Sequence, residues 1–455
     1  MRRPTRTTAP LALAALLVLP GCLGISLPRP LGVETGRAYT SGPTAPVLLT
    51  NAAWWRAMDD PVLDTLVAEA LDANLSLAAA RARRDAARAA VDTIGSGATV
   101  TGRADGQLSR GGSARVGVTA TLDWLLDPWG GRRARLRAAL AEADAAEAER
   151  AAAELAVLLE VSTGYVELRH QQRVAALRRD SRARRQDTLA LFNRLKQAGE
   201  ATRLDPLRIR SQIAEIDAEL PGLDATVTAR RADLAALTGR SAAHAAPLPP
   251  RGQPVPGLAP DLGIPADLLR NRPDIRAAEL AYAAAVARID AARAALYPTL
   301  SLGGTIGLDL SDGRVGRQAL FGPALTLPAL PRGPVRAELA RRHALATAAH
   351  AEWQALVVDA IAEVETALAA WRAAGATRQA AARSVRLSRE ALGATEELIE
   401  AGLITLTDLV TVEDQLSNAE RGLADANRDV ALQFVILNVR LGAGHATSGT
   451  PPLDK

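Results

Sequence analysis

Five histidines and one cysteine are the side chains of this 455-residue sequence best suited to bind a metal or to start covalent chemistry. The histidines are scattered, at His170, His244, His343, His350 and His445. His343 and His350 lie seven residues apart, on one face of a helix, and would form a metal pair only if a carboxylate joined them. We therefore predict that the chain has no metal site.

Other catalytic patterns are incomplete. Gly304 and Gly307 have the separation of the last two glycines of a phosphate-binding loop, but Leu302 occupies the first position. A second strand also follows, where that loop requires a helix. No serine or threonine lies in a histidine pattern typical of a nucleophile. The sequence therefore predicts no enzyme activity and no cofactor.

Cys22, the only cysteine, ends an N-terminal leader. Three arginines precede an apolar run over 11–19, and Leu19-Pro20-Gly21-Cys22 resembles the lipobox of bacterial lipoproteins. A lone thiol cannot form an internal disulfide. We predict a signal peptide over 1–21 and a lipid anchor (palmitate) at Cys22, and Leu23 in place of Asp suggests outer-membrane sorting. The alternative is an ordinary secretory signal with an incidental cysteine.

Charge and composition exclude two further classes. The net charge of +4 falls to about +1 when the three leader arginines are removed, so the basic pI does not imply nucleic acid. After Cys22 no uninterrupted apolar stretch reaches the ~18 residues of a transmembrane helix. Aromatic residues make up only 3% of the chain. This alanine-rich composition favours closely packed helices.

The chain is a tandem duplication. An Ala-Gly pair followed six residues after the Gly by an Asp occurs at Gly199 and Asp205, and again 203 positions later at Gly402 and Asp408. Gln212, Leu220 and Gly239 recur at the same offset, and the first helix of each copy matches at an offset of 198, as in the following pairs: Leu77 with Ile275, Ala79 with Ala277, and Val91 with Ile289.

Periodicity divides the chain into a series of segments. We predict a lipid-anchored linker (22–60), a first repeat (61–240), an inter-repeat linker (241–263), a second repeat (264–444) and a C-terminal tail (445–455). The first repeat has a helix over 61–91, strands at about 97–124 and a helical hairpin at about 132–239. The second has strands at about 299–327 and a hairpin at about 334–442. A helix over 132–197 would be roughly 100 Å long, at ~1.5 Å per residue.

The hairpin turns follow from glycine and aspartate. Gly199 and Gly402 permit the left-handed exit from each long helix, and Asp205 and Asp408 are expected to cap the returning helices. Pro206 is predicted at the first helical position, and Pro221 is expected to kink the first returning helix.

The strands have one apolar and one polar face, as Val116, Val118 and Leu122 alternate with Gly117, Thr119 and Thr121. Four such strands cannot close a barrel, and open sheet edges are not tolerated in lipid. If the strands enter a membrane, the chain must oligomerise until the sheet closes, with eight strands from two chains or twelve from three.

Several motifs resemble the TolC-like outer-membrane efflux proteins, in the lipoprotein branch associated with resistance-nodulation-division pumps. The resemblance covers about 54–444. It is carried by Leu122-Asp123-Trp124 with Pro128-Trp129-Gly130-Gly131-Arg132, by Arg270-Asn271-Arg272-Pro273-Asp274-Ile275, by Tyr297-Pro298, and by Glu400-Ala401-Gly402-Leu403 with Thr407-Asp408-Leu409.

The resemblance implies a mainly α fold with a small β part. A homotrimer would form a 12-stranded β-barrel in the outer membrane, continuous with a periplasmic α-barrel. It also implies an outer-membrane channel that passively conducts substrates from an inner-membrane pump and a periplasmic membrane-fusion adaptor to the outside. The hairpin turns would form the periplasmic tip and its aperture.

At that tip Asp408 aligns with a gate aspartate of the family, and Asp205 aligns with its counterpart in the first repeat. Thr411 replaces a second acid, and the gate-associated Tyr and Arg positions hold Ile399 and Ile404. We therefore expect an apolar constriction that includes Leu403 and Ile404. The alternative function is a periplasmic coiled-coil scaffold or adaptor lipoprotein, in which the strands would form a small soluble domain. An adaptor would carry one hairpin, whereas this sequence carries two.

Overall fold

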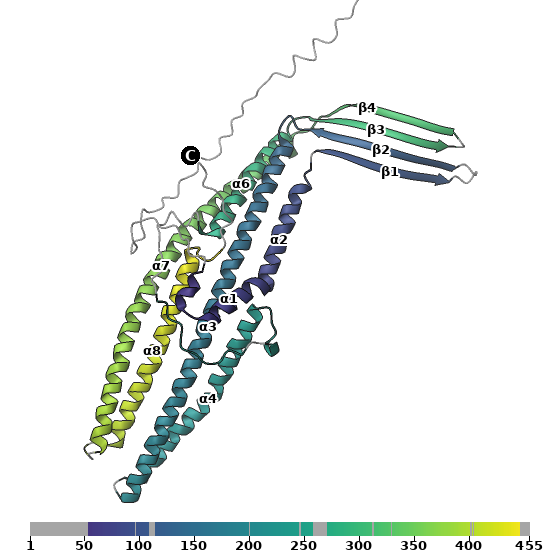
Figure 1. Cartoon of the computed structure of the whole chain (residues 1–455). Helices are drawn as coiled ribbons and strands as arrows, with labels where there is room; N and C mark the ends of the chain where they lie inside the picture. The colour runs from purple at the N-terminus through teal and green to yellow at the C-terminus, as the bar shows by residue number, and fades with distance from the viewer. Residues whose placement is uncertain are drawn as a thin grey trace, which may run out of the picture. The chain divides into compact units, whose positions relative to one another are not determined.

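The computed structural model describes residues 53–445, except 96, 109–113, 200, 245–246, 258–270, 312–313, 329, 401–402 and 404. The predicted signal peptide, Cys22, Gly402 and Ile404 lie outside the described residues, as does most of the predicted lipid-anchored linker. Within them the two repeats have the predicted pattern of a strand pair and a long helical hairpin (Figure 1).

The elements follow one another in the same order in both repeats. The first contains η2 (Trp54–Met58), α1 (Pro61–Ala73), α2 (Leu75–Asp92), β1 (Ala98–Leu108), β2 (Ala114–Leu126), α3 (Gly131–Ala198) and α4 (Leu204–Leu237). After the short η3 (Ala242–His244), the second contains α6 (Pro273–Ala294), β3 (Thr299–Ser311), β4 (Arg314–Thr326), α7 (Gly333–Glu400) and α8 (Leu406–Arg440).

The predicted helix over 61–91 is two helices. Asn74 has an extended backbone, and its side-chain oxygen accepts hydrogen bonds from the backbone N–H groups of Ser76 and Leu77 at 2.9 and 3.1 Å. Its amide nitrogen donates to the carbonyl of Leu237 at the end of α4. Asn74 thus ends α1 and caps α2, because its side chain satisfies the free amides of a new helix start.

α3 and α7 each contain 68 residues. α3 packs against α2 and α6 toward the sheet, and against α4 and α8 toward the hairpin turn, whereas α7 packs against α6 and α8 (Figure 1). α4 continues as a helix through Pro221. Among the described residues, no helix combines the length and the apolarity that a membrane span requires.

The main core lies midway along the helices. Trp54, Tyr165 and Phe434 are buried there with leucines and valines of α1, α3 and α8. The Trp54 indole donates to the carbonyl of Ala443 at 3.1 Å, so the start and the end of the described chain meet in this core.

One glycine in each repeat is required by close packing. Gly239 and Gly442, 203 residues apart, both have positive φ, which glycine adopts without strain. A Cβ at Gly239 would lie 2.6 Å from the carbonyl oxygen of Ala73, and one at Gly442 would lie 2.5 Å from that of Asn271. The end of each returning helix therefore touches the backbone just before α2 or α6.

The two strand pairs form one antiparallel sheet in the order β1-β2-β3-β4. The register between repeats pairs Val118 with Leu308, Ala120 with Ile306 and Trp124 with Leu302. These positions belong to the apolar face of each strand, so that face is continuous across the repeat boundary. Among the described strands, β1 and β4 are the two edge strands of this sheet.

Candidate functional site

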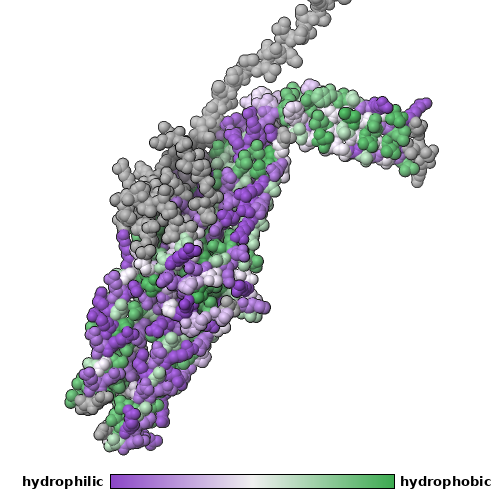
Figure 2. Space-filling model, in the orientation of Figure 1, coloured by the Kyte–Doolittle hydropathy of each residue, from purple (hydrophilic) through white to green (hydrophobic). Residues whose placement is uncertain are grey.

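The apolar face of the sheet is open to its surroundings. Val100, Val118, Ile306, Leu308 and Phe321 are all more than half exposed. Figure 2 shows apolar side chains gathered over the strands, whereas the helices are largely covered by polar ones. An exposed apolar surface this continuous is typical of a surface that contacts lipid or another protein.

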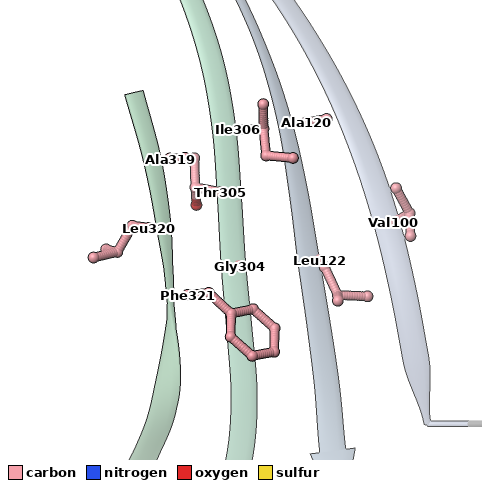
Figure 3. A pocket seen from close by; sticks show the side chains of 9 residues that line it. All are labelled: Val100, Ala120, Leu122, Gly304, Thr305, Ile306, Ala319, Leu320 and Phe321. Carbon is pink, nitrogen blue, oxygen red and sulfur yellow. The ribbon is translucent and has the colours of Figure 1, made fainter. Parts of the chain in front are cut away.

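A shallow hollow of about 370 Å³ lies on this face (Figure 3). Gly304 has no side chain to fill it, and Phe321, Leu122 and Ile306 stand around it. A Cβ at Gly304 would lie 2.9 Å from the Phe321 ring, so glycine lets the ring lie against the neighbouring strand.

The opposite face is polar. Thr101, Thr119, Thr121 and Thr305 alternate with the apolar positions and share one side of the sheet. Three residues depart from the pattern. The register of β4 places Arg317 opposite Leu308 on the apolar face and Leu320 opposite Thr305 on the polar face, and the register of β2 places Leu125 opposite Ser301 on the polar face. The sheet therefore has one mainly apolar and one mainly polar face.

At the second hairpin turn, Asp408 forms a capping box with Thr405. Its carboxylate accepts hydrogen bonds from the Thr405 hydroxyl at 2.6 Å and from the Thr405 backbone N–H at 2.9 Å. These bonds hold the pKa of the Asp408 carboxyl below its usual value. The N-cap is Thr405, so the prediction that Asp408 is itself the cap is wrong.

The first turn has the same threonine–aspartate contact, but its helix begins one residue later relative to the threonine. Asp205 accepts from the Thr202 hydroxyl at 2.7 Å and from its backbone N–H at 3.0 Å, while the Thr202 hydroxyl accepts from the Leu204 amide. Asp205 is therefore not the cap, and Pro206 is the third helical residue because α4 starts at Leu204. Gly199 ends α3 in the left-handed conformation, as predicted.

The apolar residues of the two turns differ in burial. Leu403 is 71% exposed. Behind the turns, Phe192, Ile209 and Leu409 form a buried cluster that joins α3, α4 and α8. Leu403 is thus outside the core that holds the hairpins together, while the structure does not describe its predicted partner Ile404.

A buried ionic network, which the sequence analysis missed, lies close above this cluster. Arg185 of α3 is 3% exposed and Glu413 of α8 is 8% exposed, and their side chains form a salt bridge. Arg185 also binds Asp414 at 2.5 Å, and the Thr188 hydroxyl donates to Glu413 at 2.8 Å. Burial raises the pKa of Glu413 against the opposing effect of Arg185.

The same pair of helices carries further polar contacts along its length. Arg184 donates to Ser417 at 3.1 Å and lies 3.4 Å from Glu420. Nearer the core, His170 contacts Asp425 at 2.7 Å. Together with the network around Arg185, these contacts form what we call the α3–α8 seam. The spacing of Arg184 and Arg185 does not identify their partners, which lie more than 220 residues away.

The Arg-Pro-Asp motif has a structural role in this chain. Arg272 is buried and binds Asp274 at 2.6 Å and Glu363 of α7 at 2.8 Å. It also donates to the carbonyl of Arg440 at the end of α8. Arg272 therefore joins the start of α6 to both helices of the second hairpin.

His350, one of the two histidines considered for metal binding, packs against aromatic rings. His350 lies between Tyr282 of α6 and Trp353, with ring centroids 4.9 and 5.8 Å away. Across the described ranges, no group of three His, Cys, Asp or Glu side chains could hold a metal ion.

A family model described as outer membrane efflux protein matches residues 66–240 and 264–443. Nodulation protein T of Rhizobium leguminosarum bv. trifolii is 32% identical over 97% of this chain and 98% of its own length. The pyoverdine export outer membrane protein OpmQ of Pseudomonas putida is 30% identical, covering 96% of this chain and 98% of its own. The solved structure of the outer-membrane channel OprN has a TM-score of 0.80 and 30% identity, covering 88% and 94% of the two chains.

Proposed function

The chain belongs to the outer membrane efflux protein family, and from this premise we propose how three copies build one conduit and where it closes. The protein is the outer-membrane channel component of a tripartite efflux system and works with a periplasmic adaptor and an inner-membrane pump. It is a transport channel and not an enzyme.

The observation that carries the proposal is the two-faced sheet with its two edge strands. Its apolar face suits lipid, but the outer edges of β1 and β4, which pair with no other described strand, do not. Pairing β1 of one copy with β4 of the next satisfies the backbone groups of both edges. Three copies then close a barrel of twelve strands, an even number as in other bacterial outer-membrane barrels.

The long helices extend the conduit from the membrane. α3 and α7 are each about 100 Å long at ~1.5 Å per residue, and both start within seven residues of a strand end. Their hairpin turns therefore lie far from the sheet, on the periplasmic side. The adaptor docks at this end.

We place the gate at these turns. Asp205 and Asp408 are engaged by their own threonines, so neither carboxylate is free of local hydrogen bonds. Leu403 is exposed and, with Ile404, supplies an apolar constriction. On this proposal Asp408→Ala raises single-channel conductance only modestly, and a several-fold rise would contradict an apolar gate.

We propose that the lipid anchor is at Cys22 and that the signal peptide precedes it. From Cys22 to Trp54 the chain has 32 residues and spans at most about 110 Å, at ~3.3–3.6 Å each. Trp54 packs in the same core as Leu158, which lies about 40 Å along α3 from Gly131, at ~1.5 Å per residue. The segment from Cys22 to Trp54 is therefore long enough for a lipid at Cys22 to reach the end of the helices nearest the sheet.

The test is conductance of the purified protein in a planar bilayer, together with its mass in mild detergent. We expect discrete channel openings and a trimer whose electrophoretic mobility changes on heating. A monomer without conductance would instead favour the alternative of a periplasmic scaffold or adaptor lipoprotein.

A further inference from the structure

Among the described strand positions, Arg317 is the only charged residue on the apolar face of the sheet. It lies opposite Leu308, which in turn lies opposite Val118 of β2. The Arg317 side chain is exposed. On the proposed channel this face meets lipid, where a charged side chain is costly in the middle of the apolar band and much less costly near its margin. The depth of Arg317 in the membrane therefore matters.

Arg317 lies near the end of the sheet that is farther from the helices. β4 begins at Arg314, next to the hairpin that joins it to β3, and its other end leads into α7. Arg317 is three residues from Arg314, about 10 Å along the strand at ~3.3 Å per residue. Because the long helices extend into the periplasm on the proposed channel, this end of the sheet is at the outer leaflet. An arginine at this depth can carry its guanidinium to the lipid headgroups.

The hollow on the same face lies deeper in the membrane than Arg317 (Figure 3). Small residues at Ala120, Gly304 and Ala319 leave it open, and the Phe321 ring stands beside it. Phe321 is four residues from Arg317, so the two side chains share a face and are about 13 Å apart along the strand at ~3.3 Å per residue. The lining is mainly apolar, so the hollow suits a hydrocarbon chain.

We propose that this face binds a phosphorylated lipid of the outer leaflet, with a phosphate on Arg317 and an acyl chain in the hollow. The order of the two features matches such a lipid, because its phosphate is at the surface and its chains point toward the bilayer centre. A guanidinium can donate two parallel hydrogen bonds to a phosphate. The site rests on the proposed channel and adds a specific lipid to it. Its residues all come from one chain, so a trimer has three sites.

The site is tested by native mass spectrometry of the purified full chain in mild detergent, with diphosphoryl lipid A added as the probe. We expect up to three lipid molecules bound to each trimer. Arg317→Gln should lower the association constant about fivefold, the contribution of one cation beside an anionic headgroup. Arg317→Lys keeps the charge and should retain most of the binding.

The matched control is Arg314→Gln, at the same end of β4. Arg314 lies opposite Ser311 on the polar face, three residues from Arg317. This substitution therefore removes the same charge from the other side of the sheet and should change lipid binding little. Equal losses of binding in the two glutamine variants would overturn the assignment of the phosphate to Arg317.

The hollow has its own pair of variants. Ala120 is exposed and lines the hollow, so Ala120→Leu fills the space that the acyl chain needs. It should lower the association constant about fourfold, the equivalent of one methylene group of the chain. Thr119→Leu adds the same side chain at the neighbouring residue, on the polar face, and should leave binding unchanged. If both leucine variants bind lipid A equally well, no acyl chain occupies the hollow.

Failure of the lipid site and failure of the channel give different results. A trimer that conducts in a planar bilayer but binds lipid A equally well with and without Arg317 overturns the lipid site and leaves the channel intact. A monomer that does not conduct overturns the channel as well.

Discussion

α3 and α7 have the same length and the same place in their repeats, but their surroundings differ. α3 is enclosed by helices of both repeats, and it carries the buried Arg185 that binds Glu413 and Asp414. Among the described elements α7 packs mainly against α6 and α8 of its own repeat, and Leu345 and Leu387 of α7 are exposed. The difference shows that two duplicated helices can have the same backbone structure while their side chains differ according to the elements that each helix contacts.

The largest expected effect is on the α3–α8 seam. Arg185→Ala leaves Glu413 buried without its cation and should lower the free energy of unfolding by about 3–5 kcal/mol. Denaturant unfolding of the detergent-solubilised protein measures this. Arg389→Ala removes a cation that is 60% exposed and binds Glu420 from α7, so it should cost less than about 1 kcal/mol. Equal losses of unfolding free energy in the two variants would mean that the burial of Arg185 does not make its ion pair more important than that of Arg389.

The next largest effect is expected at Gly239 and Gly442, which occupy equivalent positions in the two repeats. Gly239→Ala and Gly442→Ala each force a positive φ on alanine and place a Cβ against a backbone carbonyl. We expect each to lower the free energy of unfolding by about 1–3 kcal/mol, and by similar amounts. A large loss of stability from only one of the two substitutions would show that the repeats also differ where the returning helix ends against the backbone before α2 or α6.

The threonine–aspartate contacts at the two turns should respond less. Thr405→Ala removes the hydroxyl that Asp408 and its amide bind, at a cost of about 1 kcal/mol. Thr202→Ala removes the same contact with Asp205 at the first turn. Amide hydrogen exchange at the start of α8 and of α4 measures local fraying in each variant. Thr407→Ala is the control, because its side chain makes none of the capping bonds.

The smallest expected effect is the loss of stability at acidic pH that comes from Asp274, a residue of the second repeat. Burial raises the pKa of Asp274, but the Arg272 guanidinium outweighs it, so the folded pKa lies below the ordinary value of 3.8. The contribution of Asp274 is therefore complete above that value and is lost as the pH falls through the lowered pKa. At the corresponding position the first repeat has Ser76, beside the uncharged cap Asn74.

Thermal unfolding between pH 5 and pH 3 should show a smaller loss of stability in Asp274→Asn than in the unmodified protein. The unmodified protein should be the more stable of the two at pH 7. An identical pH profile in both proteins would contradict the assignment.

Much of the fold could be predicted from the sequence, because its signals are local. Long stretches without proline indicated the long helices, and alternation of apolar residues indicated the strands. The break at Asn74 was missed because the helical periodicity continues across it, while the side chain prefers to cap α2. The Thr405 cap was missed because aspartate is suited to either role in a capping box.

The candidate site was less accessible to prediction. The α3–α8 seam joins Arg185 to residues 228 and 229 positions away, and no local pattern specifies such a pairing. The register between β2 and β3 also depends on which faces meet, although the alternation on each strand was correctly assigned. The roles of Leu403, Asp205 and Asp408 at the gate remain predictions.

The polar side of the sheet has a consequence for what passes along it. Its described positions carry mainly threonine, serine, glycine, glutamine and charged groups, with Leu125 and Leu320 as exceptions, and none carries an aromatic ring. Hydroxyl groups exchange hydrogen bonds with water as readily as with a solute, and flat molecules find no surface on which to stack. Compounds of many shapes can therefore slide past this wall without being held, and the choice of cargo must be made before it is reached.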